Sequence, residues 1–174
     1  KINLIIYGFI DHHEERNTGD VSWLRYLTKF SKRKHLSLPY ASLGKNDELI
    51  KNSPVKYIKL PLRRYSSFVT KVEKKIMQIK LFFNNKNKVK VTEKIILELK
   101  KKSENHGAKF VFVFLLSDEK KISFYSNFLK KNNIGFIDCS YPLSDDLIVK
   151  NEGHPNKKLH KMYSNCIYQG LYLN

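Results

Sequence analysis

Cysteine is scarce in this chain, because Cys139 and Cys166 are the only two among 174 residues. Their spacing fits no common pattern of metal ligands, and two cysteines are too few for a disulfide framework. The sequence leaves open whether they form a single disulfide bond or stay as two buried thiols. It predicts no metal site and no bound cofactor.

Long apolar segments are also lacking. The longest uninterrupted apolar run, Phe110–Leu116, is far shorter than the roughly 20 residues that cross a bilayer as a helix. We therefore expect no transmembrane segment. The first residue is Lys1 rather than Met and already lies in an expected strand, which indicates processing or truncation upstream.

Acidic residues are few: 16 Asp and Glu face 33 Lys and Arg, for a formal net charge of +17. The excess is concentrated between Lys56 and Lys102, where fifteen basic residues accompany three glutamates. Such a segment can attract nucleic acid, anionic lipid or an acidic polymer. However, nucleic-acid readers favour Arg, most of the basic residues here are Lys, and no nucleic-acid module is recognisable. We expect no specific nucleic-acid partner and interpret the segment as a solvated helical surface. A non-catalytic module that binds anionic polymer or nucleic acid through residues 56–102 is the alternative.

Apolar residues make up 41% of the chain, which is enough to build a core. Three apolar segments predict strands, namely Ile2–Phe9, Phe110–Leu116 and Ile134–Asp138. A helix that Ser117 caps joins the last two, and such a β-α-β unit has parallel strands and a right-handed crossover. The sequence therefore predicts one α/β domain over residues 1–174. We expect the three strands to be adjacent and parallel in a doubly wound sheet with helices on both faces.

Two amphipathic helices are expected within the basic segment, separated by Asn84–Lys88. The side chains expected to point inward are Phe68, Val72, Ile76, Ile79 and Ile95. The lysines expected to face water are Lys71, Lys74, Lys75, Lys94 and Lys101. Aromatic side chains exposed for base stacking, such as Tyr65, Phe82 or Phe83, would instead favour nucleic-acid binding.

The other segments alternate helices and loops. A short helix is expected over Val21–Ser31, and residues 36–62 predict loops with short strands because three prolines interrupt them. The final helix is expected to begin at Pro155, to run to about Gln169 and to stop at Gly170.

Two polar clusters follow predicted strands, where α/β sheets place their sites. The first is Asp11–Asn17 and the second is Asn151–His160. In the second, His154 precedes a helix and Glu152 lies two residues earlier, an arrangement that suits a general base oriented by a carboxylate. We expect a hydrogen bond of about 2.6–3.2 Å between the two side chains. An exposed polar turn that merely starts a helix is the alternative interpretation.

Two segments of the chain resemble the SGNH (GDSL-type) hydrolases. Gly153-His154-Pro155-Asn156, followed by His160, is similar to the last block of that family, and Ile5–Asn17 resembles the third block in a variant form. The resemblance covers Ile2–Asn17 and about Phe110–Leu171, and Thr18–Gly107 then forms a helical and loop insertion. It implies a three-layer α/β/α fold with a flavodoxin-like parallel sheet that lacks its first strands.

The resemblance also implies roles for individual residues. His154 corresponds to the general base, Glu152 to its acid with Asp146 in reserve, and His12, His13 and Asn17 compete to donate to the oxyanion. We expect the imidazole of His154 to share a cleft with these three. The implied substrate is a small ester or an O-acylated carbohydrate, hydrolysed or transferred by a Ser-His-acid mechanism.

The nucleophile is the main departure from the family pattern. The family's Gly-Asp-Ser block precedes the third block, and Gly19-Asp20-Val21-Ser22 lies on the wrong side of the strand. No Gly-x-Ser-x-Gly elbow is present either. We therefore expect the serine to come from residues upstream of Lys1 and this chain alone to be inactive. Ser22 and Ser140 become the candidates if the chain by itself hydrolyses esters.

Overall fold

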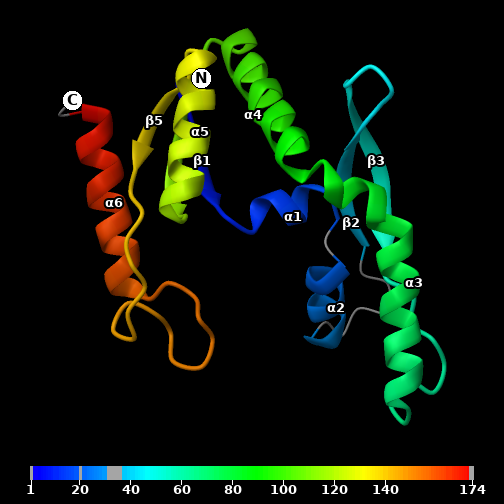
Figure 1. The fold of residues 1–174 in the computed structure, drawn as a ribbon. Coiled ribbons are helices and arrows are strands. Elements are labelled where there is room, and N and C mark those ends of the chain that lie inside the picture. The colour runs from blue at the N-terminus through cyan, green and yellow to red at the C-terminus, as the bar shows by residue number, and fades with distance from the viewer. Residues whose placement is uncertain (1, 20, 31–36, 173–174) are drawn as a thin grey trace. The chain divides into compact units, whose positions relative to one another are not determined.

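A computed structural model describes residues 2–19, 21–30 and 37–172 (Figure 1). The chain divides into two compact units. Unit 1 comprises Lys1–Asp11 and Leu97–Asn174, and unit 2 comprises His12–Ile96. Unit 2 thus takes up most of the segment that was expected as an insertion.

A parallel sheet of three strands forms the centre of unit 1. Its strands are β1 (Leu4–Ile10), β4 (Lys109–Leu116) and β5 (Gly135–Asp138), in the order β1-β4-β5. Both strand pairs are parallel, which confirms the predicted adjacency and direction. The middle strand β4 is apolar at nearly every position because both of its faces are covered.

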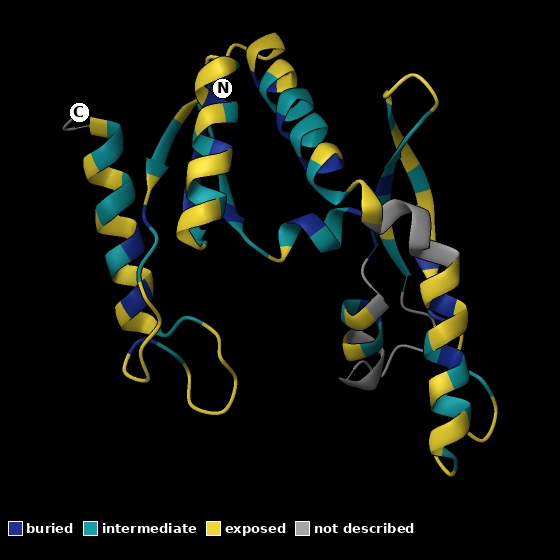
Figure 2. Cartoon of the chain, viewed as in Figure 1, coloured by how far each residue is buried: buried dark blue, intermediate teal, exposed yellow. Residues whose placement is uncertain are grey.

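A helix packs against each face of this sheet. On one face, Phe112 and Phe114 of β4 gather with Phe9 around Tyr125 of α5 (Glu119–Lys131), and the ring centroids of Phe9 and Tyr125 are 4.9 Å apart. On the other face, Val111 and Val113 pack with α6 (Lys157–Tyr172). Successive side chains of a strand point to opposite faces, so a single apolar run supplies both cores. The buried positions are dark blue in Figure 2.

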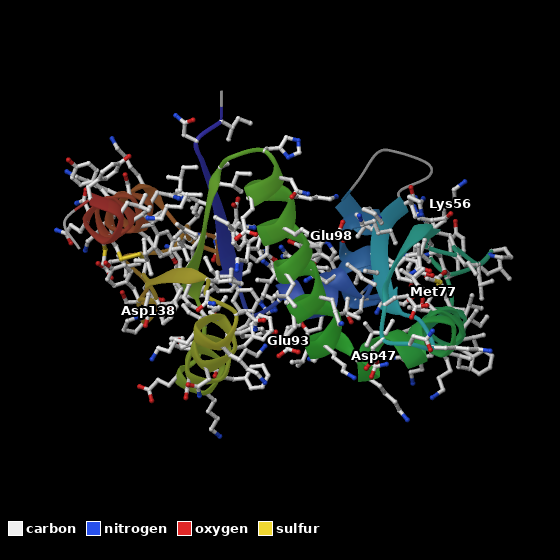
Figure 3. The ribbon with its side chains drawn as sticks, turned by 90° about the horizontal axis from the view of Figure 1, so that it is seen from above. Asp47, Lys56, Met77, Glu93, Glu98 and Asp138 are labelled. Carbon is white, nitrogen blue, oxygen red and sulfur yellow. A yellow bond between two sulfur atoms is a disulfide. The ribbon has the colours of Figure 1, made fainter. Side chains whose placement is uncertain are left out.

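The contact between β5 and α6 is close and covalently fixed. A disulfide bond joins Cys139, directly after β5, to Cys166 of α6 (Figure 3). Helix α6 also continues past Gly170, which corrects the expected stop at that residue. A Cβ atom at Gly170 would lie 2.7 Å from Cγ2 of Ile137. The glycine is therefore needed where the helix approaches the strand, and it does not end the helix.

Unit 2 combines a β-hairpin with helices. It contains α1 (His13–Asn17), α2 (Val21–Phe30), β2 (Ser37–Leu43), β3 (Leu49–Lys56) and α3 (Ser67–Lys86), and it includes the first part of α4 (Lys88–Asn105). The two strands pair antiparallel, and their register shifts between Leu38 and Tyr40, at Pro39. A proline cannot donate to the ladder and fits such an irregularity. The core of this unit joins Leu24, Val55, Tyr57 and Met77.

The buried face of α3 differs from the expected one. Phe68, Ile76 and Ile79 are exposed at 71%, 40% and 64%, whereas Glu73 and Met77 are fully buried. Met77 (labelled in Figure 3) reaches the core of unit 2. The Glu73 carboxylate accepts the Leu60 N–H at 2.8 Å. The apolar periodicity pointed to the wrong stripe because a buried glutamate with its own partners cannot be recognised as a core position from its polarity.

Other features of the basic segment agree only in part with what the sequence predicted. Of the lysines expected in water, Lys71, Lys75 and Lys101 are exposed, while Lys74 and Lys94 are half-buried. Only Asn87 separates α3 from α4, a shorter break than expected. The side chains of Phe82 and Phe83 lie outside the described residues, as does Ser31 at the expected end of α2.

No helix within the described ranges has the length and apolar character needed to cross a bilayer.

The disulfide bond should contribute strongly to the stability of unit 1. It is formed across a sequence separation of 27 residues, for which loop-closure entropy gives about 3.5 kcal/mol. We expect reductant to lower the free energy of unfolding in urea by about this amount. The double variant Cys139→Ala/Cys166→Ala is the control, and reductant should not affect it. Identical unfolding curves of the unmodified chain with and without reductant would contradict the bond.

The corrected face of α3 predicts unequal effects of two neighbouring truncations. Met77→Ala removes a fully buried side chain and should lower the free energy of unfolding by about 2–5 kcal/mol. Ile79→Ala, on the exposed face of the same helix, should change it by no more than about 0.5 kcal/mol. Urea denaturation of both variants measures the difference, and a larger loss from Ile79→Ala would restore the face expected from the sequence.

Candidate functional site

The loop between β5 and α6 forms a small hairpin that presents His154. Ile148 and Pro155 form an antiparallel bridge, and the Val149 N–H donates to the His154 carbonyl at 2.7 Å. The turn contains two left-handed residues, Asn151 with φ of 65° and Gly153 with φ of 70°. Asparagine and glycine tolerate this conformation better than other residues. The backbone conformation of the turn therefore determines the position of the His154 Cα atom, from which the imidazole extends.

His154 and Glu152 lie beside each other at the surface. The distance from Nδ1 of His154 to Oε2 of Glu152 is 3.9 Å, and the two side chains are 70% and 65% exposed. This separation allows an ion pair when the imidazole is protonated, but it is longer than the expected hydrogen bond. The carboxylate is thus near the imidazole without yet fixing its orientation.

The reserve acid, Asp146, has other partners. Its carboxylate pairs with the Lys158 ammonium and accepts the Ser144 hydroxyl at 2.5 Å. The hydrogen bond from Lys158, followed by that from Ser144, lowers the pKa of Asp146 below its usual value. Of the two candidate acids, Glu152 is therefore the one in ion-pair range of His154.

Asn156 connects the loop to the helix. Its Oδ1 accepts the N–H groups of Lys158 at 2.9 Å and Leu159 at 3.2 Å, and its Nδ2 donates to the carbonyls of Asp146 and Ile148. An asparagine at this position is a favoured helix cap. Helix α6 accordingly begins at Lys157, and Pro155 belongs to the bridge instead of the expected first helical position.

Three polar residues that the sequence analysis did not combine lie at the carboxyl edge of the parallel sheet. Asp11 directly follows β1, Ser117 directly follows β4, and Ser140 is the second residue after β5. Oδ1 of Asp11 and the two hydroxyl oxygens are buried and have no hydrogen-bond partner among the described residues. Buried polar atoms normally have one. The signal available in the sequence was that each residue follows an apolar strand closely.

The other atoms around this edge are held in place. The Asp118 N–H donates to Oδ2 of Asp11 at 3.3 Å, and the Lys121 ammonium donates to the Asp11 carbonyl at 3.3 Å. Asp118 also caps α5 by accepting the Lys121 N–H. The expected cap, Ser117, is not used in this way, because Asp118 caps the helix instead. Such an edge can supply hydrogen bonds to a hydroxyl-bearing molecule.

His12, His13 and Asn17 belong to unit 2. His13 and Asn17 are the first and last residues of α1, and His12 directly precedes it. One N–H of the Asn17 amide donates to Oγ1 of Thr92 at 3.0 Å, and Nδ1 of His12 lies 3.8 Å from Oε2 of Glu15. The amide of Asn17 thus helps to hold α1 against α4. Because His154 and Glu152 belong to unit 1, the shared cleft remains a prediction.

The environment of His13 changes its protonation equilibrium. Burial, followed by the positive charges of Arg16 and His12, lowers the pKa of His13 below its usual value of 6.5. The imidazole is therefore mainly neutral at neutral pH. A neutral imidazole can donate one hydrogen bond, which is compatible with the expected oxyanion role.

Within the described residues, no group of three or more His, Cys, Asp or Glu side chains is arranged to hold a metal ion. Comparison with protein-family models, with curated proteins and with solved structures found no match to this chain.

The contribution of the Asn156 cap to the free energy of unfolding should be measurable. Asn156→Ala removes the acceptor for two helix N–H groups and should lower the free energy of unfolding by about 1–2 kcal/mol. Asn127→Ala, at an exposed position inside α5, is the control and should be neutral or slightly stabilising. Thermal and urea unfolding of both variants measure the effect. Equal stability of the two variants would mean that Asn156 does not anchor the loop.

Proposed function

We propose that this chain carries the general base of an SGNH-type ester hydrolase. The observation that carries the proposal is the Glu152–His154 pair, exposed on the loop that follows the last strand of a parallel sheet. Ligands of open α/β sheets bind at the carboxyl ends of the strands. The pair therefore has both the chemistry and the topological position that a base needs.

In the proposed mechanism, His154 accepts the proton of a serine that lies outside these 174 residues. The serine attacks the ester carbonyl, and His154 then protonates the leaving alcohol. Glu152 stabilises the imidazolium. Its distance of 3.9 Å would shorten when substrate and serine are present, as catalytic hydrogen bonds often do. His12, His13 and Asn17 are the proposed side-chain donors to the oxyanion.

The proposed fold is the later part of a flavodoxin-like, three-layer domain. The order β1-β4-β5 and the packing of α5 and α6 on opposite faces support this assignment. In that fold, further strands would pair with the edge of β1 that lies opposite β4. In such a sheet the residues that follow β1 and the loop before α6 would border the same crevice.

The proposed substrate is an O-acylated carbohydrate or another small ester. The polar residues Asp11, Ser117 and Ser140 at the carboxyl edge of the parallel sheet support this class, because sugar hydroxyl groups both donate and accept hydrogen bonds. The substrate class itself comes from the family resemblance and is an inference by analogy.

One observation favours the alternative, a module that binds anionic polymer or nucleic acid. Tyr65 and Phe68 are exposed at 89% and 71% within the basic segment. Exposed aromatic rings beside lysines can stack on nucleic-acid bases. This function would use unit 2 and would leave His154 without a role.

Hydrolysis of an activated ester such as p-nitrophenyl acetate tests the hydrolase. We expect no activity above background from the 174 residues alone, and activity from a version extended upstream through a Gly-Asp-Ser block. In the extended version, His154→Ala should reduce turnover by roughly 10³-fold or more. Glu152→Gln should also reduce it, while Asp146→Asn should not.

His106→Ala is the matched control, because His106 is another exposed histidine of unit 1. Turnover in the extended version that is unaffected by His154→Ala would refute the proposed base. Robust hydrolysis by the 174 residues that Ser140→Ala abolishes would refute the external nucleophile.

A further inference from the structure

An apolar stripe of α3 is left exposed in unit 2. The apolar periodicity of this helix predicted an inward face, but Phe68, Ile76 and Ile79 on that face are exposed (yellow in Figure 2). The opposite face, with Met77, joins the core instead. Single apolar side chains are common on protein surfaces, whereas a stripe of them marks an interaction site. The proposed hydrolase assigns no role to this stripe.

The loop before α3 extends the stripe. Leu62 is 66% exposed, and Tyr65 is exposed in the same turn. The Leu62 carbonyl closes this turn by accepting the N–H groups of Tyr65 at 2.9 Å and Ser66 at 3.0 Å. Helix α3 begins directly after the turn, at Ser67. The turn and the helix thus carry a run of exposed apolar side chains that we call the apolar surface, namely Leu62, Tyr65, Phe68, Ile76 and Ile79.

The backbone of Leu62 is left-handed, with φ of 63°. Glycine and asparagine adopt this conformation more readily than a residue with a bulky side chain does. Leucine at this position therefore combines an unfavourable backbone conformation with an apolar side chain in water. A residue of this kind indicates a functional constraint.

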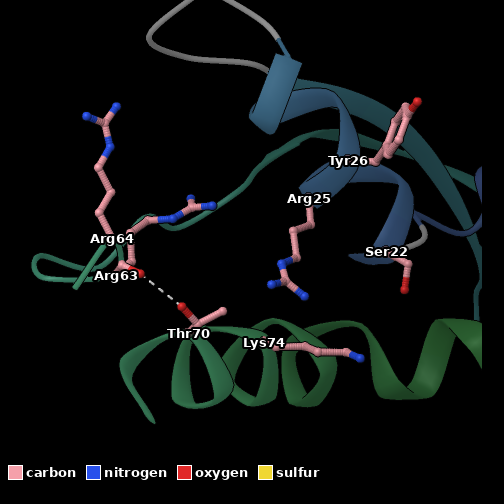
Figure 4. A pocket seen from close by; sticks show the side chains of 7 residues that line it. All are labelled: Ser22, Arg25, Tyr26, Arg63, Arg64, Thr70 and Lys74. Carbon is pink, nitrogen blue, oxygen red and sulfur yellow. Dashed lines mark hydrogen bonds between the residues drawn. The ribbon is translucent and has the colours of Figure 1, made fainter. Parts of the chain in front are cut away.

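The turn is held on α3 by the residues around Leu62. The Thr70 hydroxyl donates to the Arg63 carbonyl at 3.1 Å, the dashed line in Figure 4. Nη1 of Arg63 lies 3.4 Å from Oε1 of the buried Glu73, whose Oε2 accepts the Leu60 N–H at 2.8 Å. The backbone on both sides of Leu62 is thus anchored, and the exposed leucine is presented by a fixed turn.

The segment that carries the apolar surface is strongly basic. Residues 58–79 include six Lys and Arg and a single acidic residue, Glu73. The Glu73 carboxylate is buried, so it adds no negative charge to the apolar surface. Lys71 and Lys75 are exposed, and their helical spacing places them on the face of α3 that carries Phe68. Arg64 is also exposed, and Figure 4 shows its side chain directed away from α3.

We propose that the apolar surface docks on an anionic lipid bilayer, with its apolar side chains among the headgroups and the neighbouring cations on the lipid phosphates. Apolar and basic side chains on one side of a helix are the combination that binds such an interface. Lysine suits this place because its stem packs with apolar neighbours while its ammonium reaches the headgroups. A chain bound in this way lies on the bilayer and needs no spanning helix.

Two other occupants fit the apolar surface less well. In a twofold pairing with a second copy of the chain the same surface meets itself, so Lys71 and Lys75 would approach their own copies. Nucleic-acid bases stack on aromatic rings, whereas Leu62, Ile76 and Ile79 are aliphatic. An anionic bilayer is the occupant that uses both the aliphatic side chains and the positive charge.

Sedimentation of the complete chain with lipid vesicles tests the proposal. One set of vesicles contains equal parts of phosphatidylcholine and phosphatidylserine, and the other contains phosphatidylcholine alone. The ionic strength is about 0.15 M, so that distant charges are screened. We expect binding to the anionic vesicles and binding to the neutral ones that is weaker by about tenfold or more.

Two double variants separate the apolar from the charged contribution. Leu62→Asn/Phe68→Gln removes apolar area at exposed positions, and asparagine tolerates the left-handed backbone. We expect this variant to bind the anionic vesicles about tenfold or more weakly. Lys71→Gln/Lys75→Gln should weaken the binding by a similar factor, about tenfold or more. Urea unfolding of both variants verifies that they are folded.

The controls change exposed residues of unit 1. Phe124→Gln is the apolar control, and Lys101→Gln/Lys131→Gln is the charge control. Both should bind the anionic vesicles as the unmodified chain does. Absence of binding to these vesicles, or equal weakening by the matching control, would overturn the proposal.

Two further results would assign the apolar surface to another occupant. A single-stranded DNA oligonucleotide that binds tightly and is released by Lys71→Gln/Lys75→Gln, in a chain that does not bind vesicles, would overturn the proposal in favour of nucleic acid. A dimer in sedimentation velocity that Leu62→Asn/Phe68→Gln dissociates would overturn it in favour of a second copy.

A fluorescent reporter in the turn measures insertion directly. Tyr65→Trp places an indole at an exposed position, and its emission should shift to the blue when anionic vesicles are added. Phosphatidylcholine brominated in its acyl chains should quench this emission. The unmodified chain, in which Trp23 is the single tryptophan, is the control. Emission from Tyr65→Trp that is unchanged on vesicles that bind the chain would overturn the insertion of the apolar surface.

Discussion

The burial of β4 on both faces is the constraint on which unit 1 depends. Phe112 and Phe114 supply the core under α5, and Val111 and Val113 supply the core under α6. The neighbouring strands β1 and β5 run parallel to β4, and the helices that connect parallel strands cover the faces of such a sheet. This arrangement brings the carboxyl ends of all three strands to one edge, and that edge carries the polar atoms of the candidate site.

The loop after β5 obtains its shape from contacts at both of its ends. The disulfide bond between Cys139 and Cys166 fixes the end of β5 to α6. Asn156 caps α6 with its Oδ1, and its Nδ2 donates to the Asp146 carbonyl of the loop. His154 is thus exposed on a defined backbone. The helix cap Asn156 and the proposed base His154 lie only two residues apart. The Asn156 variant tests the stability of the loop, and the His154 variant tests turnover.

A buried ion pair has a similar organising role in unit 2. Glu73 and Arg63 meet beside the core that Met77 shares with Leu24 and Val55. Breaking a buried pair by removing one partner is costly. Glu73 also accepts the Leu60 N–H, so this buried face of α3 holds the loop that contains Arg63. Phe68 and Ile79 are exposed, whereas Glu73 and Met77 on the same helix are buried.

The sequence by itself determined the three parallel strands and the helix between β4 and β5, because long apolar runs and regular periodicities leave few alternatives. It also brought Glu152 near His154 from their spacing, but the 3.9 Å between Nδ1 and Oε2 is longer than the hydrogen bond it predicted. The sequence could not identify the disulfide bond, the stripe of α3 that is buried, or the set formed by Asp11, Ser117 and Ser140. These depend on residues far apart along the chain, and their partners are decided by tertiary packing, which local patterns do not encode.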